Sequence, residues 1–356
     1  MPVTSTDETT KAGRGARPWQ LRPGARFACE GDGLCCSDMH ALGPVSRTEA
    51  RRLRVIQPGS VVPHDGLKIS MTRVVPHAAG GQVCTFLGPD GGGCGVYEVR
   101  PSTCRIFPFG LVETPAGMRV TTEHRCPCRS LGPRPPLDLG HARRALVDAA
   151  GRTLRPDGHA GATVVIEGRR RTPFARFVAR HETPLLAALL APEPDPLAAL
   201  GVAPLPPLAG LTWPDVAHLL RAHDDGSMGD EAIATFGDAL LTLAGGSTRA
   251  RRTRPWAWSF DRAEARGEPT SAARVLGDWA ADVLWSLGWS ARGDWQLARL
   301  ELATRVAVAE VITARLTGEG LRPDRAAAEA VMMAELVGSL GLWESVVGAM
   351  REAQAP

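Results

Sequence analysis

The chain has 356 residues, of which 44% are hydrophobic and 22% charged, and its formal net charge is +3. These values are typical of a globular protein of two or three domains, and they exclude a chain that binds nucleic acid through its overall charge. No stretch reaches the roughly 18 uninterrupted apolar residues of a membrane span, and the N-terminus lacks the apolar core of a secretory signal. We therefore expect a cytoplasmic protein that does not contact membranes.

The first part of the chain predicts short elements separated by loops. Residues 1–26 are polar and rich in Gly, Pro and Arg, which predicts a disordered tail. Ser46 and Glu49 form a capping-box pattern, which predicts a short helix that ends at Ile56. Strand-like runs follow at 69–75, 83–87, 106–113 and 118–124, and the last two predict a hairpin across "TPAG".

The cysteines divide the chain into two regions. All eight lie between residues 29 and 128, at Cys29, Cys35, Cys36, Cys84, Cys94, Cys104, Cys126 and Cys128. The change in composition predicts a loop-rich cysteine-cluster domain at 27–130, a linker at 131–160 that begins with "LGPRPPLD", and a mostly helical domain at 161–356. The predicted fold class is therefore α+β, with a small metal-binding domain followed by a mostly α-helical domain.

Helix signals dominate the second region. Thr163–Glu167 predicts one strand, and residues 174–191 predict a first helix. Thr212 and Asp215 form a second capping box with Pro214 in the first turn, and Asp230 is expected to cap a helix that stops at Gly245–Gly246. Two long helical segments are expected at about 292–317 and 324–350.

Clustered cysteines in a cytoplasmic protein indicate a metal site more often than disulfides. The spacings are C-x5-C-C, C-x9-C-x9-C and C-x-C, and thiolates at such positions suit zinc, copper(I) or iron–sulfur clusters. The paired C-x2–4-C knuckles of zinc sites are absent, which favours an iron–sulfur cluster, such as [4Fe–4S], over zinc. The alternative is a disulfide scaffold, which the even number of cysteines permits.

The adjacent thiols Cys35 and Cys36 lead to a prediction of their own. In an extended segment successive side chains point to opposite faces, so we expect only one of the two to reach the metal. The predicted site combines Cys29, one of the adjacent pair and the thiols of Cys84, Cys94 and Cys104. Cys126 and Cys128 would complete this site or replace part of it.

Three motifs resemble one known family in order along the chain. "CGVYEVRPSTCRIFPF" at 94–109 resembles the signature C-x-[IV]-Y-x-x-R-P-x-x-C-R-x-[FY]-P of the YkgJ-type cysteine-cluster family, and "CTFL" at 84–87 resembles its upstream element. "CEGDGLCC" at 29–36 resembles the opening CxxCxxCC motif, with Asp32 at the position of the second cysteine. The resemblance implies a zinc- or iron-chelating domain over about 27–128.

Several other side chains are candidates for this centre. Asp32 is either an oxygen ligand or an ordinary loop aspartate, and His40 and His124 are candidates for a mixed site. Arg100 and Arg105 flank Cys104 and would tune a cluster by charge and hydrogen bonds, unless they form surface salt bridges. Tyr97, the only tyrosine, would either anchor the cluster loop or simply pack.

Two alternative functions remain open. The layout of a cysteine module followed by helices is similar to that of flagellin lysine N-methylases, which implies S-adenosylmethionine and a protein substrate. The loop "GPDGGGCG" at 88–95 lacks the context of a dinucleotide-binding turn and is better explained as a flexible loop presenting Cys94. "TRARRTRPWAWSF" at 248–260 mixes arginines with aromatic residues, which indicates either binding of a nucleic acid or partner, or aromatic side chains packed on helices.

Overall fold

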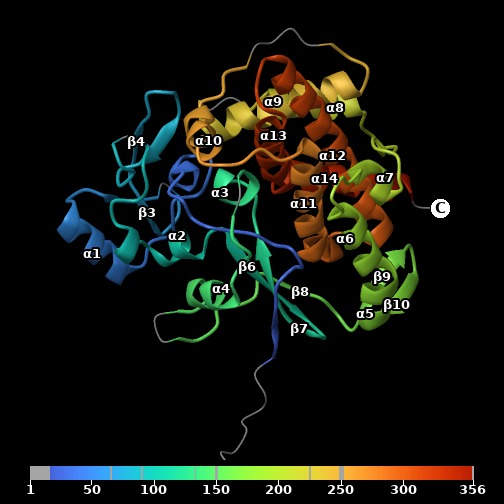
Figure 1. The fold of residues 1–356 in the computed structure, drawn as a ribbon, viewed down its shortest axis with the longest axis horizontal. Coiled ribbons are helices and arrows are strands. Elements are labelled where there is room, and N and C mark those ends of the chain that lie inside the picture. The colour runs from blue at the N-terminus through green and yellow to red at the C-terminus, as the bar shows by residue number, and fades with distance from the viewer. Residues whose placement is uncertain are drawn as a thin grey trace, which may run out of the picture.

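The computed structural model describes residues 17–64, 66–89, 91–132, 134–148, 151–223, 226–247 and 252–354. Most of the tail predicted to be disordered, residues 1–16, lies outside these ranges. Figure 1 shows short strands and loops, in blue to green, on one side of the molecule, and a group of long helices, in yellow to red, on the other. The predicted α+β fold class is confirmed. We call residues 27–130 the cysteine-rich part and residues 161–354 the helical part.

The cysteine-rich part and the segments that flank it form small sheets. Their strands are β1 (Trp19–Gln20), β2 (Val61–Pro63), β3 (Ser70–Thr72), β4 (Val74–Pro76), β5 (Gln82–Cys84), β6 (Phe109–Thr114), β7 (Gly117–Thr122) and β8 (Gly158–His159). Their helices are α1 (Arg47–Ile56), α2 (Ser102–Ile106), α3 (Pro127–Ser130) and α4 (Leu139–Ala145). β1, β7, β6 and β8 form one sheet in that order, while β2–β3 and β4–β5 are separate antiparallel pairs. The capping box of Ser46 and Glu49 and the β6–β7 hairpin are both confirmed.

Two segments have more structure than the sequence predicts. Residues 17–26 were expected in the disordered tail, but β1 pairs in parallel with β7, and the Arg22 side chain is buried between Asp278 and Asp282. The segment 131–160 was expected to be a linker, but it contains α4 and contributes β8 to the four-stranded sheet. Composition alone predicts loops here because the partners that order these segments lie elsewhere in the chain.

The helical part begins with a hairpin and continues as packed helices. Its elements are β9 (Thr163–Glu167), β10 (Arg170–Pro173), α5 (Phe174–Phe177), α6 (Thr183–Leu189), α7 (Pro196–Leu200), α8 (Trp213–Arg221), α9 (Met228–Leu243), α10 (Ala257–Glu264), α11 (Ala272–Trp285), α12 (Trp295–Gly318), α13 (Pro323–Gly338) and α14 (Gly341–Ala353). A π-helical turn, Val178–Glu182, joins α5 to α6. α12 packs against α13, and α9 lies against both.

Two expectations for these helices are corrected. Asp230 does not cap α9, because the cap is Ser227, whose side chain accepts a hydrogen bond from the Asp230 backbone N–H. The segment 324–350 is two helices, α13 and α14, bent by 76° at a short break. The capping box of Thr212 and Asp215 at the start of α8 is confirmed.

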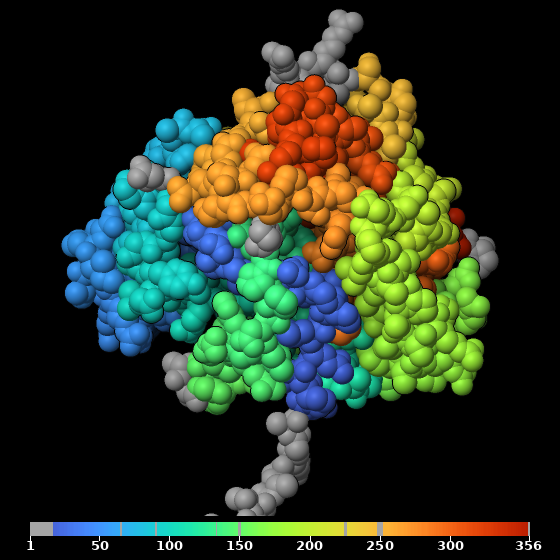
Figure 2. Space-filling view, in the orientation of Figure 1, coloured from blue at the N-terminus to red at the C-terminus, as the bar shows by residue number. Residues whose placement is uncertain are grey.

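The hydrophobic core crosses the predicted domain boundary. One cluster of buried side chains includes Phe27, Phe109 and Leu131 from the first part of the chain together with Trp279 and Trp343 from the helices. A smaller cluster, which includes Leu53, Phe86 and Cys84, lies within the cysteine-rich part. In the space-filling view the orange surface of α10 and the residues after it lies directly against the blue and cyan cysteine-rich part (Figure 2). The two parts differ in secondary structure but are packed together.

In the part of the chain that the structure describes, no single helix is long and apolar enough to cross a membrane. Only α13 and α14 taken together meet that criterion, and they form a bent pair.

Candidate metal centre

Seven of the eight cysteines line one cavity of about 260 Å³, which we call the cysteine cavity. They are Cys29, Cys35, Cys36, Cys84, Cys94, Cys104 and Cys128. All eight cysteines lie in described residues, and each is a free thiol. The structure therefore brings together thiols that are spread over a hundred residues of chain, and it does so without disulfides.

A tight turn sets the directions of Cys35 and Cys36. Gly33 has a φ of +85°, and the residues after it, Leu34–Cys36, form a 3₁₀ turn closed by the Cys36 N–H donating to the Gly33 carbonyl at 2.8 Å. Both thiols line the cysteine cavity, so the prediction that they point to opposite faces is wrong. Successive side chains on a 3₁₀ turn are about 120° apart, since it has 3.0 residues per turn, so two neighbours can share one cavity.

The other thiols reach the cavity from different elements. Cys84 ends β5, and its Sγ accepts a hydrogen bond from the Phe86 backbone N–H at 3.5 Å. Cys94 follows the glycine-rich loop and pairs with Leu87 in an isolated bridge. Cys104 lies in α2, and Cys128 lies in α3. Because these elements belong to different hairpins and turns, the tertiary fold, and not the local spacing, assembles the thiols.

Cys126, at the start of α3, is the one cysteine outside the lining of the cavity. Hydrogen bonds from Cys126 and Cys36 hold the pKa of Cys35 well below its usual range. Cys126 also lies within hydrogen-bond reach of Cys128. A metal would deprotonate each thiol that binds it.

Two other thiols of the cavity are shifted toward the protonated form. Burial raises the pKa of Cys84 to about 11 and that of Cys104 to about 12.

Asp32 lies in the wall of the same cavity and is fully buried. Its Oδ2 atom accepts hydrogen bonds from the Cys128 thiol at 3.0 Å and from Arg134 at 3.3 Å, and its other oxygen pairs with Arg266. Both oxygens are therefore engaged by guanidinium groups or by a thiol. Sequence reasoning did not identify Arg134 and Arg266, because neither lies in a cysteine motif.

The two candidate histidines lie in different places. His40 lines the cysteine cavity, and its Nε2–H donates to the Arg125 carbonyl at 3.0 Å, which leaves Nδ1 as the acceptor nitrogen. Burial lowers the pKa of His40 to about 4, so the ring is neutral at ordinary pH. His124 lies outside the cavity, with its Nε2 atom 2.7 Å from Asp282 of α11. Of the two, only His40 is beside the thiols.

Tyr97 and Arg100 also line the cavity, and the Arg100 guanidinium carbon lies 4.0 Å from the centre of the Tyr97 ring. Burial raises the pKa of Tyr97, and the nearby Cys29, to which the Tyr97 hydroxyl makes a hydrogen bond, raises it further. Arg105 is not part of the lining, and its Nε atom has no hydrogen-bond partner among the described residues. The structure therefore groups two of the three candidate cofactor-binding residues with the thiols.

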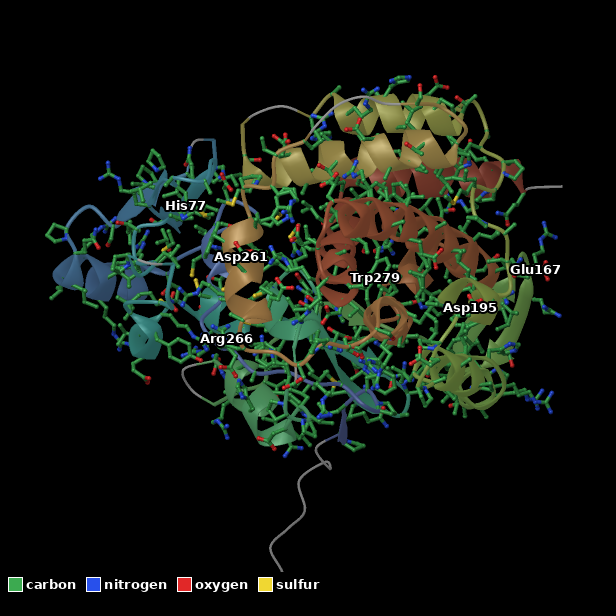
Figure 3. The ribbon with its side chains drawn as sticks, turned by 45° about the horizontal axis from the view of Figure 1, so that its top comes forward. His77, Glu167, Asp195, Asp261, Arg266 and Trp279 are labelled. Atoms are coloured by element: carbon green, nitrogen blue, oxygen red, sulfur yellow. The ribbon has the colours of Figure 1, made fainter. Side chains whose placement is uncertain are left out.

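α10 holds the loops that carry the cysteines against the helical part. Trp258 packs so closely on Gly33 and Gly91 that a Cβ atom at either glycine would lie 2.9 Å from its ring. Arg266, just after α10, pairs with Asp32 from the same side. Figure 3 shows α10, with Asp261 labelled on it, between the cysteine-rich part and the helices.

The contacts of α10 favour the packing interpretation of "TRARRTRPWAWSF". Trp256 and Phe260 are fully buried, and the Trp256 Nε1–H donates to Glu329 at 2.9 Å. Arg254 pairs with the same Glu329. Residues 248–251 of the stretch lie outside the described residues. Trp256 and Phe260 are thus not available for stacking on nucleic acid bases.

The donor set fits a group larger than one ion. No three His, Cys, Asp or Glu side chains among the described residues are arranged to hold a single metal ion as they stand. A structural zinc ion takes four donors that close around it in a tetrahedron, whereas these thiols surround a cavity. Thiolates are soft donors that suit zinc and iron–sulfur clusters alike. The arrangement therefore fits a metal centre bound by thiolates.

Comparison with known proteins agrees with this site. Residues 28–127 match the family model CxxCxxCC, described as "Putative zinc- or iron-chelating domain". The matched segment contains seven of the eight cysteines, and Cys128 follows it directly. Neither the curated proteins nor the solved structures that were compared gave a match to the chain. The cysteine-rich part is thus a cysteine-cluster domain of this family, and the helical part lies outside the match.

Proposed function

We propose that the cysteine-rich part binds an iron–sulfur cluster in the cysteine cavity. The observation that carries this proposal is that seven thiols line one cavity of about 260 Å³, a space larger than a single ion would fill. The family description, which names zinc or iron, supports metal binding in general and is compatible with either metal. The volume of the cavity, and the absence of a preformed single-ion site among the described residues, favour the cluster.

The cluster would be held by thiolates from this set. Four thiolates suffice for one [4Fe–4S] cluster, so we expect one principal site and some cysteines that are not ligands. Tyr97 and Arg100 would donate hydrogen bonds or offset negative charge at the sulfur atoms, which adjusts the reduction potential of a cluster. Such a cluster supplies electron transfer, and this chain's own residues set its potential and its access to solvent.

Metal analysis of protein purified without oxygen tests the proposal. We expect about four iron atoms and four acid-labile sulfides per chain, little zinc, and a brown colour that dithionite bleaches. One zinc ion per chain without labile sulfide would overturn the cluster and leave a zinc-binding domain. The double variant Cys35→Ser and Cys36→Ser should lose the metal, whereas Ser345→Ala in α14 serves as a control that should keep it.

A further inference from the structure

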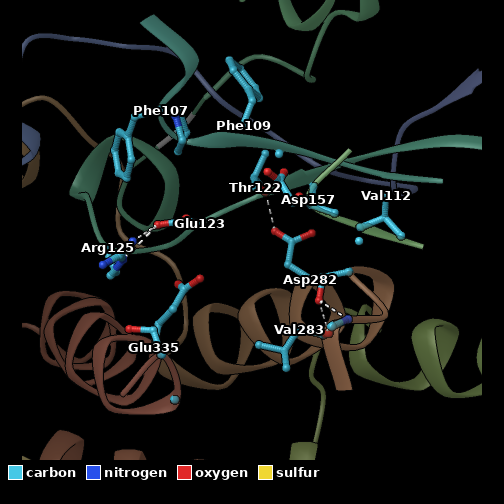
Figure 4. Close-up of a pocket in the computed structure, with 18 of the residues that line it drawn as sticks. Phe107, Phe109, Val112, Thr122, Glu123, Arg125, Asp157, Asp282, Val283 and Glu335 are labelled. Carbon is cyan, nitrogen blue, oxygen red and sulfur yellow. Dashed lines mark hydrogen bonds and ion pairs between the residues drawn. The ribbon is translucent and has the colours of Figure 1, made fainter. Parts of the chain in front are cut away.

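A second cavity, of about 510 Å³, lies directly beside the cysteine cavity. Three residues, Thr103, Phe107 and Arg125, line both cavities and so form the wall between them. Figure 4 shows Phe107 and Arg125 at one end of the second cavity, with Glu123 and Glu335 close by. Ligand sites in proteins commonly have volumes of about 300–1,000 Å³, so this cavity has the size of a small organic molecule.

The walls combine an apolar surface with a few charged groups. Phe107 and Phe109 present aromatic rings from the cysteine-rich part, and Val112 of β6 and Val283 of α11 add aliphatic surface. A molecule with an apolar body would therefore displace water from these walls. The charged side chains of the walls that have no ion-pair partner decide which polar group the bound molecule would carry.

Most charged groups in the walls are already paired. Glu123 forms an ion pair with Arg125, and Arg305 pairs with Glu301. Asp282 is shared by Arg22 and Arg129 in the core. None of these groups needs a ligand to balance its charge.

Two carboxyl groups remain. Among the described residues, neither Asp157 nor Glu335 forms an ion pair. Asp157 accepts a hydrogen bond from the Leu111 backbone N–H at 2.8 Å, and Glu335 accepts one from the His124 backbone N–H. Burial, with Glu123 nearby, raises the pKa of Glu335 to about 8, so this side chain is readily protonated while the cavity holds no cation.

Among the described residues, Arg292 is the basic group of these walls that forms no ion pair. It donates a hydrogen bond to the Gly338 carbonyl. The groups of the second cavity that form no ion pair are therefore two carboxyl groups and one guanidinium group, an excess of acidic groups.

We propose that the second cavity binds an organic cation, a protonated amine on an apolar body, whose charge the carboxyl groups of Glu335 and Asp157 attract. The cavity itself does not depend on the metal. A further step rests on the function proposed above: if the cysteine cavity holds an iron–sulfur cluster, the bound amine lies next to it. The amine would then be the substrate or effector of the cluster.

Three probes of nearly equal shape test the charge preference on the full-length, metal-loaded protein. We expect calorimetry to show that 4-phenylbutylammonium binds at least tenfold more tightly than 4-phenyl-1-butanol or 4-phenylbutyrate. Glu335→Gln and Asp157→Asn should each weaken the amine about tenfold, the effect of one charge-assisted hydrogen bond, and leave the alcohol unchanged. Glu344→Gln, an exposed carboxylate on α14, is the matched control and should change nothing.

Equal binding of the three probes, or amine binding that survives both variants, would overturn the proposal. If Glu335→Gln unfolds, Asp157→Asn alone decides, because Asp157 is exposed. The same titration on protein freed of metal separates the amine proposal from the cluster proposal, because the second cavity should still bind the amine without the metal. In loaded protein the amine should also shift the visible absorption of the centre, and intact binding without that shift would place the amine away from the metal.

Discussion

The Cys128 thiol donates a hydrogen bond to Oδ2 of Asp32 across 3.0 Å, and the two residues are 96 positions apart in the chain. Asp32 occupies the position at which the CxxCxxCC motif has its second cysteine. Here the carboxylate accepts from a thiol and balances Arg134 and Arg266 at the edge of the cysteine cavity. We infer that Asp32 balances the charge of these two arginines at the position where the motif has a cysteine, and that Cys128 supplies a thiol to the cavity in place of that cysteine.

The first prediction follows from this anchor. Asp32→Asn leaves two guanidinium groups without their buried counter-charge, which should lower the free energy of unfolding by about 3 kcal/mol in denaturant titrations. Metal per chain should not change, because the inferred role of Asp32 is to balance the two arginines and not to bind the metal. Glu30→Gln is the matched control: it removes a half-exposed partner of the same Arg134 and should cost less than about 1 kcal/mol. Loss of metal from Asp32→Asn at unchanged stability would instead identify Asp32 as a ligand.

The second prediction separates two neighbouring cysteines. Cys126 does not line the cysteine cavity, and its thiol lies within hydrogen-bond reach of Cys35 and Cys128. A serine hydroxyl also donates one hydrogen bond and accepts others, so Cys126→Ser should keep its metal, whereas Cys128→Ser should lose most of it. Metal analysis of the two variants checks this, and equal losses would show that Cys126 is a ligand after all.

The third prediction concerns the turn at Gly33. A Cβ atom there would meet both the Gly91 carbonyl and the Trp258 ring at 2.9 Å, at a φ of +85°. Gly33→Ala should therefore reduce both stability and metal content, because Cys35 and Cys36 follow directly. Gly66→Ala has the same unfavourable φ with no atom within 4 Å, so it should cost only the roughly 1–2 kcal/mol of a left-handed residue. If both variants behaved alike in unfolding and metal assays, the packing of Trp258 would not matter to the centre.

Local signals in the sequence predicted local structure well. The capping boxes at Ser46 and Thr212 are confirmed because each consists of residues within one helical turn. Asp230 was the wrong cap of α9 because Ser227 and Asp230 are both good caps, and the backbone conformation that decides between them depends on the loop before the helix. A capping signal therefore locates a helix start to within about a turn.

The candidate site shows where sequence reasoning ended. The motifs identified the cysteines as one group, but their directions depend on turns such as the one at Gly33. Trp258 and Arg266 contact the cysteine loops only through the tertiary fold, since α10 follows them late in the chain. The second cavity could not be predicted either, because its walls come from the β6–β7 hairpin and from helices α11 and α13.

The last prediction concerns the pH dependence of stability. The pKa of Glu335 is raised from 4.5 to about 8, by burial first and then by the nearby Glu123, while Arg125 and the His124 N–H partly oppose the shift. The folded state therefore prefers the protonated acid. Its stabilising effect is complete below pH 4.5 and is lost as the pH rises through 8.

Glu335→Gln keeps an uncharged group of the same shape, so it should match the parent protein at pH 4 and be more stable at pH 8. We expect that difference to exceed about 1.4 kcal/mol, the equivalent of one pKa unit. Denaturant titrations at pH 4, 6.5 and 8 measure it, with Glu344→Gln as the exposed control. Parallel pH profiles for Glu335→Gln and the parent protein would mean that Glu335 is ionised in the folded state. A cation in the second cavity would then bind without releasing a proton from this side chain.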